Sequence, residues 1–169
     1  MADRVTARTR SRMMSRVRSK DTRFELDMRK RLHSLGFRYR LHRKDLPGRP
    51  DIVFPRYSAA IFINGCFWHL HRCYLSSIPR TKSKWWKAKL DRNHSRDGEA
   101  VESLKKLGWR VMILWECGIR RPGVNSGTEL MKTADKAAKF LLSSKQYQEI
   151  PKTPYFPESF KRKRKRCFA

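Results

Sequence analysis

The chain has 169 residues, 39% of them hydrophobic, with five Trp and nine Phe, which is enough apolar material for one domain with a packed core. Lys and Arg number 41 and Asp and Glu 15, giving a formal net charge of +26. A charge of this size exceeds what solubility requires and predicts nucleic acid as the partner. Binding at a membrane interface is the weaker alternative, because basic residues occur throughout the chain and the aromatic residues do not follow one helix face.

The sequence also indicates a compartment. No signal peptide opens it and no apolar stretch approaches a membrane span, so we expect a cytoplasmic protein, associated with the nucleoid, that has no membrane partner. Four cysteines, three of them near a histidine or at the end of a predicted strand, fit a metal site in a reducing compartment better than a disulfide framework.

Residues 1–20 carry seven Lys or Arg and one acid, which predicts a basic arm that becomes ordered on DNA. A solvated leader is the alternative. Asp21 or Thr22 then predicts the cap of a helix that Gly36 ends.

Glu25 lies in the first turn of this predicted helix, on the same face as Met28, Leu32 and Leu35. Its carboxylate is therefore expected to point inward, where it needs a partner. Two interpretations stay open: a structural ion pair with an arginine, or membership of a functional site.

Residues 37–42 alternate apolar and polar, as in a half-buried strand, and residues 46–50 (Leu-Pro-Gly-Arg-Pro) predict a turn. The turn leads to Asp51 at the start of an apolar strand, residues 52–54. A carboxylate there is well placed to hold a hard cation such as Mg²⁺. Asp after Pro is also a common turn or capping residue.

A predicted strand at residues 59–64 precedes a dense group of cysteine, histidine and aromatic residues. The spacing Cys66-x4-His71-x-Cys73 offers three zinc ligands, and Cys117 is the natural fourth if its apolar run lies beside strand 59–64. The alternative is a set of ordinary buried thiols and a core histidine, and His69 could replace His71 as the ligand. We prefer His71 because that choice leaves His69 free for chemistry.

Residues 82–94 predict a basic helix whose Trp85 and Trp86 are either core anchors or a stacking surface. Residues 95–107 predict a second helix with Asp97 in its first turn, where it most simply favours the helix dipole. A strand at 109–115 and an amphipathic helix at 128–144 follow.

The predicted elements give an α/β sandwich with a mixed sheet. We expect three regions: the basic arm (1–20), a catalytic or binding domain (21–146), and a Pro-containing tail (147–169) in which residues 161–166 are six consecutive bases.

Five separate motifs, in order and without long gaps, resemble the very-short-patch mismatch-repair endonucleases of bacteria over residues 8 to 120. They are Arg10-Ser11-x-x-Met14-Ser15 with Asp21-Thr22-x-x-Glu25, Leu46-Pro47-Gly48-Arg49-Pro50-Asp51, Gly65-Cys66-Phe67-Trp68-His69, Gly108-Trp109-Arg110-Val111, and Trp115-Glu116-Cys117. The resemblance implies a restriction-endonuclease-like fold with a structural zinc. It also implies Mg²⁺-dependent nicking of duplex DNA on the 5′ side of the thymine in a T·G mismatch, a lesion that arises from deamination of 5-methylcytosine.

The resemblance also implies roles for individual residues. Asp51 is similar to the carboxylate ligand of Mg²⁺ and His69 to the residue that activates water, with Glu25 as an outer orienter and Asp97 steadying the histidine. The zinc ligands it implies are Cys66, His71, Cys73 and Cys117. The aromatic wedge that enters the base stack is Phe67, Trp68 and Trp86, and Met14 and Arg49 are expected to contact DNA as well.

The chain departs from many relatives at two positions, where they have a polar pair with a histidine or acid second. Ile63 could offer Mg²⁺ only its backbone carbonyl, and Asn64 could contact a phosphate but cannot transfer a proton at neutral pH.

The partner implied is double-stranded DNA with a T·G mismatch, followed by mismatch-repair proteins and a repair polymerase, and we expect a monomer. One alternative function is a zinc-stapled DNA- or RNA-binding protein without catalysis, which does not explain Asp51 or Glu25. The other alternative keeps the fold and the nicking chemistry but changes the lesion.

Overall fold

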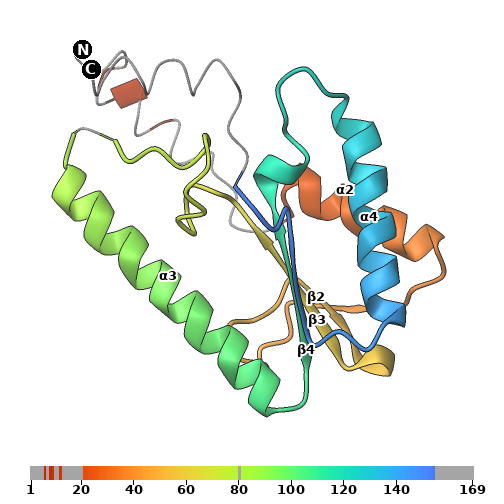
Figure 1. Ribbon diagram of the computed structural model, residues 1–169. Helices are drawn as coiled ribbons and strands as arrows, with labels where there is room; N and C mark the ends of the chain where they lie inside the picture. The colour runs from red at the N-terminus through yellow and green to blue at the C-terminus, as the bar shows by residue number, and fades with distance from the viewer. Residues whose placement is uncertain (1–5, 7, 10–11, 13–20, 80, 155–169) are drawn as a thin grey trace.

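The computed structural model describes residues 6, 8–9, 12, 21–79 and 81–154. In the described part of the chain a five-stranded mixed sheet has helices on both faces (Figure 1). In chain order the elements are α2 (Arg23–Ser34), β1 (Arg40–Leu41), β2 (Ile52–Phe54), β3 (Ala59–Asn64), α3 (Ser83–Lys106), β4 (Arg110–Trp115), α4 (Ser126–Leu142) and β5 (Tyr147–Ile150). The predicted α/β architecture with a mixed sheet is confirmed.

The strands lie in the order β1-β2-β3-β4-β5. β1, β2 and β3 are antiparallel neighbours, whereas β3, β4 and β5 run parallel. The register of β3 and β4 pairs Asn64 with Trp115, so both apolar runs end at the same edge of the sheet. The residues that follow these two strands are therefore neighbours, as predicted for the cysteines there.

Alternate side chains of the strands divide the core into two layers. Ile52, Ile61 and Leu114 face α2 and α4, whereas Val53, Ala60 and Ile113 lie in the layer of α3 (Figure 1). Successive side chains of β2, β3 and β4 point to opposite faces of the sheet, so each strand contributes to both layers. Trp115 belongs to the α3 layer, which also contains the three buried cysteines.

The helices differ in detail from their predictions. Thr22 caps α2 as expected, but Leu35, predicted to face the core, is 38% exposed because the helix ends at Ser34. The two helices predicted for residues 82–107 are one helix, α3, without a break at Ser95. Among the described residues no helix is both long enough and apolar enough to cross a membrane.

The sheet also differs from its prediction at both edges. Of the predicted strand at residues 37–42, only Arg40 and Leu41 pair with β2. Residues 147–150, which the sequence placed in the C-terminal tail, form β5 and pair with β4. The sequence pattern missed β5 because polar residues dominate this short edge strand.

Arg110 fastens the end of α4 to the sheet. Its guanidinium donates to the carbonyls of Phe140, Leu141 and Ser143 at the end of α4, and to that of Tyr57 after β2. A cation at this position satisfies carbonyls that a helix terminus leaves without partners, and it complements the helix dipole.

Candidate active site and metal centre

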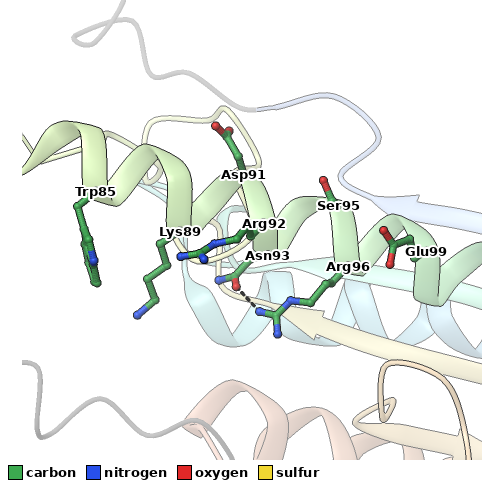
Figure 2. A pocket seen from close by; sticks show the side chains of 8 residues that line it. All are labelled: Trp85, Lys89, Asp91, Arg92, Asn93, Ser95, Arg96 and Glu99. Carbon is green, nitrogen blue, oxygen red and sulfur yellow. Dashed lines mark hydrogen bonds between the residues drawn. The ribbon is translucent and has the colours of Figure 1, made fainter.

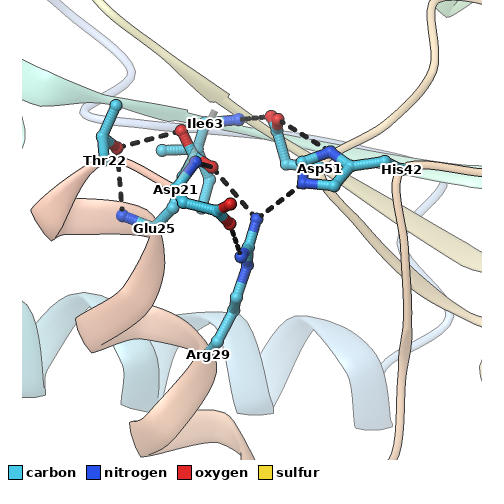
Figure 3. Close-up of polar contacts among 7 residues, drawn as sticks. All are labelled: Asp21, Thr22, Glu25, Arg29, His42, Asp51 and Ile63. Atoms are coloured by element: carbon cyan, nitrogen blue, oxygen red, sulfur yellow. Dashed lines mark hydrogen bonds and ion pairs between the residues drawn. The ribbon is translucent and has the colours of Figure 1, made fainter. Parts of the chain in front are cut away.

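Asp51 lies at the sheet edge where β2 begins and β3 ends. Its Oδ2 accepts a hydrogen bond of 2.7 Å from the Ile63 amide, and its Oδ1 is 4.0 Å from His42 Nδ1 (Figure 3). Burial raises the pKa of Asp51 to about 6, and the charge of Glu25 acts in the same direction. The Ile63 amide opposes this rise. A cation at Asp51 would replace the proton that burial favours.

Glu25 is 3% exposed and is held by three donors at the N-terminus of α2. The Asp21 amide and the Thr22 hydroxyl each donate to it at 2.9 Å, and Arg29 Nη2 donates at 3.0 Å. The structural ion pair predicted for Glu25 is therefore observed, with Arg29 as the partner. Glu25 also lies close enough to Asp51 to raise the pKa of that residue, and its membership of a functional site stays a prediction.

Sequence reasoning missed Arg29 and His42, which lie beside Glu25 and Asp51 (Figure 3). Arg29 is 5% exposed and contacts both Glu25 and His42. One signal for Arg29 was available, because position 29 follows Glu25 by four residues on the same helix face. His42 gave no such signal, since its contact with Arg29 depends on the fold.

His69 follows β3 and pairs with Asp97 of α3. The distance from His69 Nδ1 to Asp97 Oδ2 is 2.6 Å, and both side chains are about one-third exposed. Asp97 was predicted in the first turn of a helix, but α3 starts at Ser83, so it lies about four turns along. Its interpretation as a helix-dipole residue is therefore wrong, and its contact is the His69 ring.

Four potential metal ligands meet where β3 and β4 end. One ligand atom each from Cys66, His71, Cys73 and Cys117 lies within 4.8 Å of the others. His71 Nδ1 is 3.3 Å from Cys117 Sγ and 3.6 Å from Cys66 Sγ. The structure thus brings His71 to the cysteines and His69 to Asp97.

The surroundings of this metal-ligand cluster favour a bound cation. All three thiols are free and buried. Without a metal, hydrogen bonding from Cys66 lowers the pKa of Cys117 to about 5, whereas the hydrogen bond to Cys117 raises the pKa of Cys66 and burial raises that of Cys73. The His71 ring stacks on Trp115 with 4.1 Å between centroids, which fixes the plane of the ring. Three thiolates and one imidazole in a closed shell are a donor set for tetrahedral Zn²⁺.

The predicted wedge residues Phe67, Trp68 and Trp86 pack on one another. Ring centroids are 5.0 Å apart for Phe67 and Trp68, 5.3 Å for Phe67 and Trp86, and 6.0 Å for Trp68 and Trp86. Lys89 Nζ lies 5.1–5.6 Å from the ring centroids of Trp68, Trp85 and Trp86. These rings form a cluster outside both core layers with a cation on it, in which Trp85 is exposed and Phe67, Trp68 and Trp86 are half-buried.

A hollow of about 710 Å³ runs along α3 beside this aromatic cluster (Figure 2). Its lining residues are Trp85, Lys89, Asp91, Arg92, Asn93, Ser95, Arg96 and Glu99. Asn93 accepts from Arg96 and donates to the Trp68 carbonyl at 3.2 Å. Sequence reasoning missed Lys89 and Asn93, although both follow Trp85 and Trp86 at helical spacing.

Three further residues, Asn64, Arg49 and Met14, were predicted to contact DNA or its phosphate. Asn64 ends β3 and is 6% exposed. Arg49 is exposed in the turn before Asp51, where its amide donates to the Leu46 carbonyl at 3.1 Å. Met14 lies outside the described residues, as do most of the predicted arm and the end of the tail.

Comparisons with known proteins agree with these observations. Residues 2–75 match the family model described as DNA mismatch endonuclease Vsr. The type II nicking enzyme V.XorIIP of Xanthomonas oryzae pv. oryzae is 46% identical over 117 residues, which cover 69% of this chain and 86% of the relative. DNA mismatch endonuclease Vsr of Escherichia coli K12 is 42% identical over 120 residues, 71% of this chain and 77% of the relative. The type II nicking enzyme V.NmeAIP of Neisseria meningitidis serogroup A is 38% identical over 124 residues, 73% of this chain and 89% of the relative.

Proposed function

Because this chain belongs to the DNA mismatch endonuclease Vsr family and is a nuclease, we propose that it nicks duplex DNA 5′ of the thymine in a T·G mismatch. The nick would start very-short-patch repair of deaminated 5-methylcytosine. Mismatch-repair proteins and a repair polymerase would then act on the nicked strand. The observation that carries this proposal is a half-buried carboxylate, Asp51, near a histidine–carboxylate pair, His69 and Asp97.

Asp51 and the Ile63 carbonyl are the proposed Mg²⁺ ligands. Continuing the register of β2 and β3 places Pro50 opposite Ile63. Proline has no N–H, so it cannot donate to the Ile63 carbonyl. That carbonyl and the Asp51 carboxylate are oxygen donors of the kind that Mg²⁺ prefers. Bound Mg²⁺ would stabilise negative charge on the phosphate and lower the pKa of a bound water.

His69 is the proposed general base. With the proton on Nδ1 donated to Asp97, the lone pair on Nε2 is free to accept a proton from the attacking water. Asp97 holds the tautomer and stabilises the imidazolium that forms. Glu25 would orient the surroundings of Asp51, and Asn64 would contact the phosphate.

Zn²⁺ is the proposed occupant of the metal-ligand cluster, with a structural role. Cys66 and His71 are two of its four ligands and flank the segment with Phe67, Trp68 and His69. A closed zinc shell would hold this segment in place, and with it the general base and two wedge residues.

The test is Mg²⁺-dependent nicking of two end-labelled duplexes that differ only in one base pair, C·G or T·G. We expect one nick, in the thymine strand, 5′ of the mismatched thymine, and none without a divalent cation. Asp51→Ala and His69→Ala should bind both duplexes like the parent but nick neither, because the basic chain supplies the affinity. Equal cutting of both duplexes would show that the protein does not select the T·G mismatch, and a T·G duplex left uncut in Mg²⁺ would show that the lesion is different.

A further inference from the structure

Three potential metal ligands lie beside Asp51, on the α2 side of the sheet. Asp21, Glu25 and His42 each place a ligand atom within 4.8 Å of the others. Two carboxylates and an imidazole at such distances are a donor set that could take a divalent cation. These three residues could therefore hold a cation next to Asp51.

The guanidinium of Arg29 contacts all three of these residues (Figure 3). Nη1 donates to Asp21 Oδ1, Nη2 donates to Glu25 Oε2 at 3.0 Å, and Nη2 is 3.0 Å from His42 Nε2. The Arg29 side chain is 6% exposed, and a guanidinium stays protonated even when it is buried. A permanent positive charge thus already lies among the three ligands.

We propose that Arg29 is a resident cation that takes the place of a divalent ion among Asp21, Glu25 and His42, so that metal binding on this side of the sheet is confined to Asp51. The proposal rests on the proposed function, in which Asp51 holds Mg²⁺. Arg29 is then a positioning residue: it holds Glu25 through Oε2 and contacts His42, whose Nδ1 lies 4.0 Å from Asp51 Oδ1.

Electrostatics support this assignment. The two carboxylates and the guanidinium leave the group with one net negative charge, whereas a divalent ion among the same ligands would lie within a few ångströms of the guanidinium. Like charges at that separation repel strongly in a buried site. Arg29 also offers a planar fork that matches carboxylates, a geometry that a lysine ammonium lacks.

The experiment counts Mn²⁺ ions bound per zinc-loaded chain in the absence of DNA, by calorimetry and by electron paramagnetic resonance. The parent and Asp21→Asn should bind the same number, because Asp21 already pairs with Arg29. Arg29→Met should bind one more ion than the parent. The double variant Arg29→Met with His42→Gln should return to the parent number. Arg29→Lys should also keep the parent number, because a cation remains.

Two results would overturn the proposal: loss of one ion in Asp21→Asn, or a folded Arg29→Met protein that gains none. If Arg29→Met does not fold, the comparison of the parent with Asp21→Asn decides alone, because Asp21 is exposed and its replacement leaves α2 capped by Thr22. Mismatch specificity plays no part in this measurement. A protein that fails to nick T·G duplexes could still show the expected counts, so the two failures are distinguishable.

Discussion

The two carboxylate oxygens of Asp51 have different surroundings. Oδ2 is held by the Ile63 amide, whereas Oδ1 faces His42 at 4.0 Å, a distance too long for a hydrogen bond. Burial makes the ionised form unfavourable and raises the pKa to about 6. The fold therefore holds the carboxylate in a place where a cation, more than water, would stabilise it.

Asp51→Asn should stabilise the metal-free protein at pH 8 and have little effect at pH 4. The folded-state pKa of about 6 lies above the ordinary value of 3.8 for an Asp side chain, so folding favours the protonated form. The free energy of unfolding therefore falls as the pH rises from 4 to 6, and an uncharged side chain avoids this loss of about 1–3 kcal/mol. Urea unfolding at both pH values measures it. Mg²⁺ should raise the stability of the parent at pH 8 but not that of the variant, and equal stability of the two metal-free proteins at pH 8 would contradict the argument.

Asp97→Asn should reduce nicking without changing the metal-ligand cluster. The 2.6 Å contact with His69 Nδ1 selects the tautomer that leaves Nε2 free, and an amide can support the wrong tautomer. We expect a loss of kcat of about 10- to 100-fold, smaller than the 10²- to 10⁴-fold loss expected for His69→Ala. Single-turnover rates on the T·G duplex measure both losses. Parent-like rates in Asp97→Asn would leave the pair without a catalytic role.

At the scale of elements, sequence periodicity predicted most of the framework. Strands 52–54 and 59–64 and the start of α2 agree with the structure because short continuous apolar runs and a capping box are local signals. The break predicted at Ser95 is absent, because Ser95 resembles an N-cap but the preceding turns continue through it. Local pattern cannot distinguish two capped helices from one continuous helix here.

The candidate site was predictable to a different extent. Spacing identified the three cysteines of the metal-ligand cluster, since two lie within eight residues and the third follows a neighbouring strand. It left His69 and His71 as alternatives for the histidine, and the fold brings His71 to the cysteines. Asp97 and His69 are 28 residues apart, so only the family resemblance joined them before the fold did. The contact between Arg29 and His42 was not predictable from the sequence, because it joins a helix to a loop that only the fold brings close.

Arg110→Met should weaken the attachment of α4 to the sheet. Its guanidinium donates to four carbonyls, three of them at the end of α4, and an apolar side chain removes these hydrogen bonds. The Phe140 carbonyl would keep the amide and the hydroxyl of Ser143 as donors. We expect a loss of about 2–4 kcal/mol in the free energy of unfolding. Urea unfolding measures it, and Arg110→Lys is the matched control that keeps the charge but not the fork. A change below about 0.5 kcal/mol in Arg110→Met would show that water replaces these bonds at no cost.

For the whole molecule, we expect zinc bound at the metal-ligand cluster to stabilise the side of the sheet that α3 covers. It joins the ends of β3 and β4 to the segment that carries His69. Cys73→Ser should remove zinc and lower the free energy of unfolding by about 3 kcal/mol or more, because ligand binding adds directly to folding. Metal analysis and thermal unfolding test this, with Cys167→Ser, outside the described residues, as the control. Zinc in the parent should survive EDTA that strips Mg²⁺, and a fully stable zinc-free parent would contradict the structural role.

The proposed recognition of the mismatch would depend on the molecule as a whole, because the predicted wedge residues come from two segments that only the fold brings together. Phe67 and Trp68 follow β3, and Trp86 lies on α3. In the protein alone their rings pack on one another, and a Cβ at Gly65 would lie only 3.3 Å from the Trp68 ring. Insertion into DNA must therefore exchange ring-on-ring contacts for ring-on-base contacts.

Trp68→Ala should lower the ratio of T·G to matched nicking by about tenfold or more. Unstacking one base step costs a few kcal/mol, and it costs less where a wobble pair has already weakened the stack, so ring insertion favours the mismatch. Fluorescence of 2-aminopurine beside the mismatch should rise with the parent and not with this variant. Trp85→Ala is the matched control, because Trp85 is 52% exposed and also lies beneath Lys89 but is not a wedge residue. An unchanged ratio in Trp68→Ala, with normal zinc and stability, would assign recognition to hydrogen bonds with the base edges.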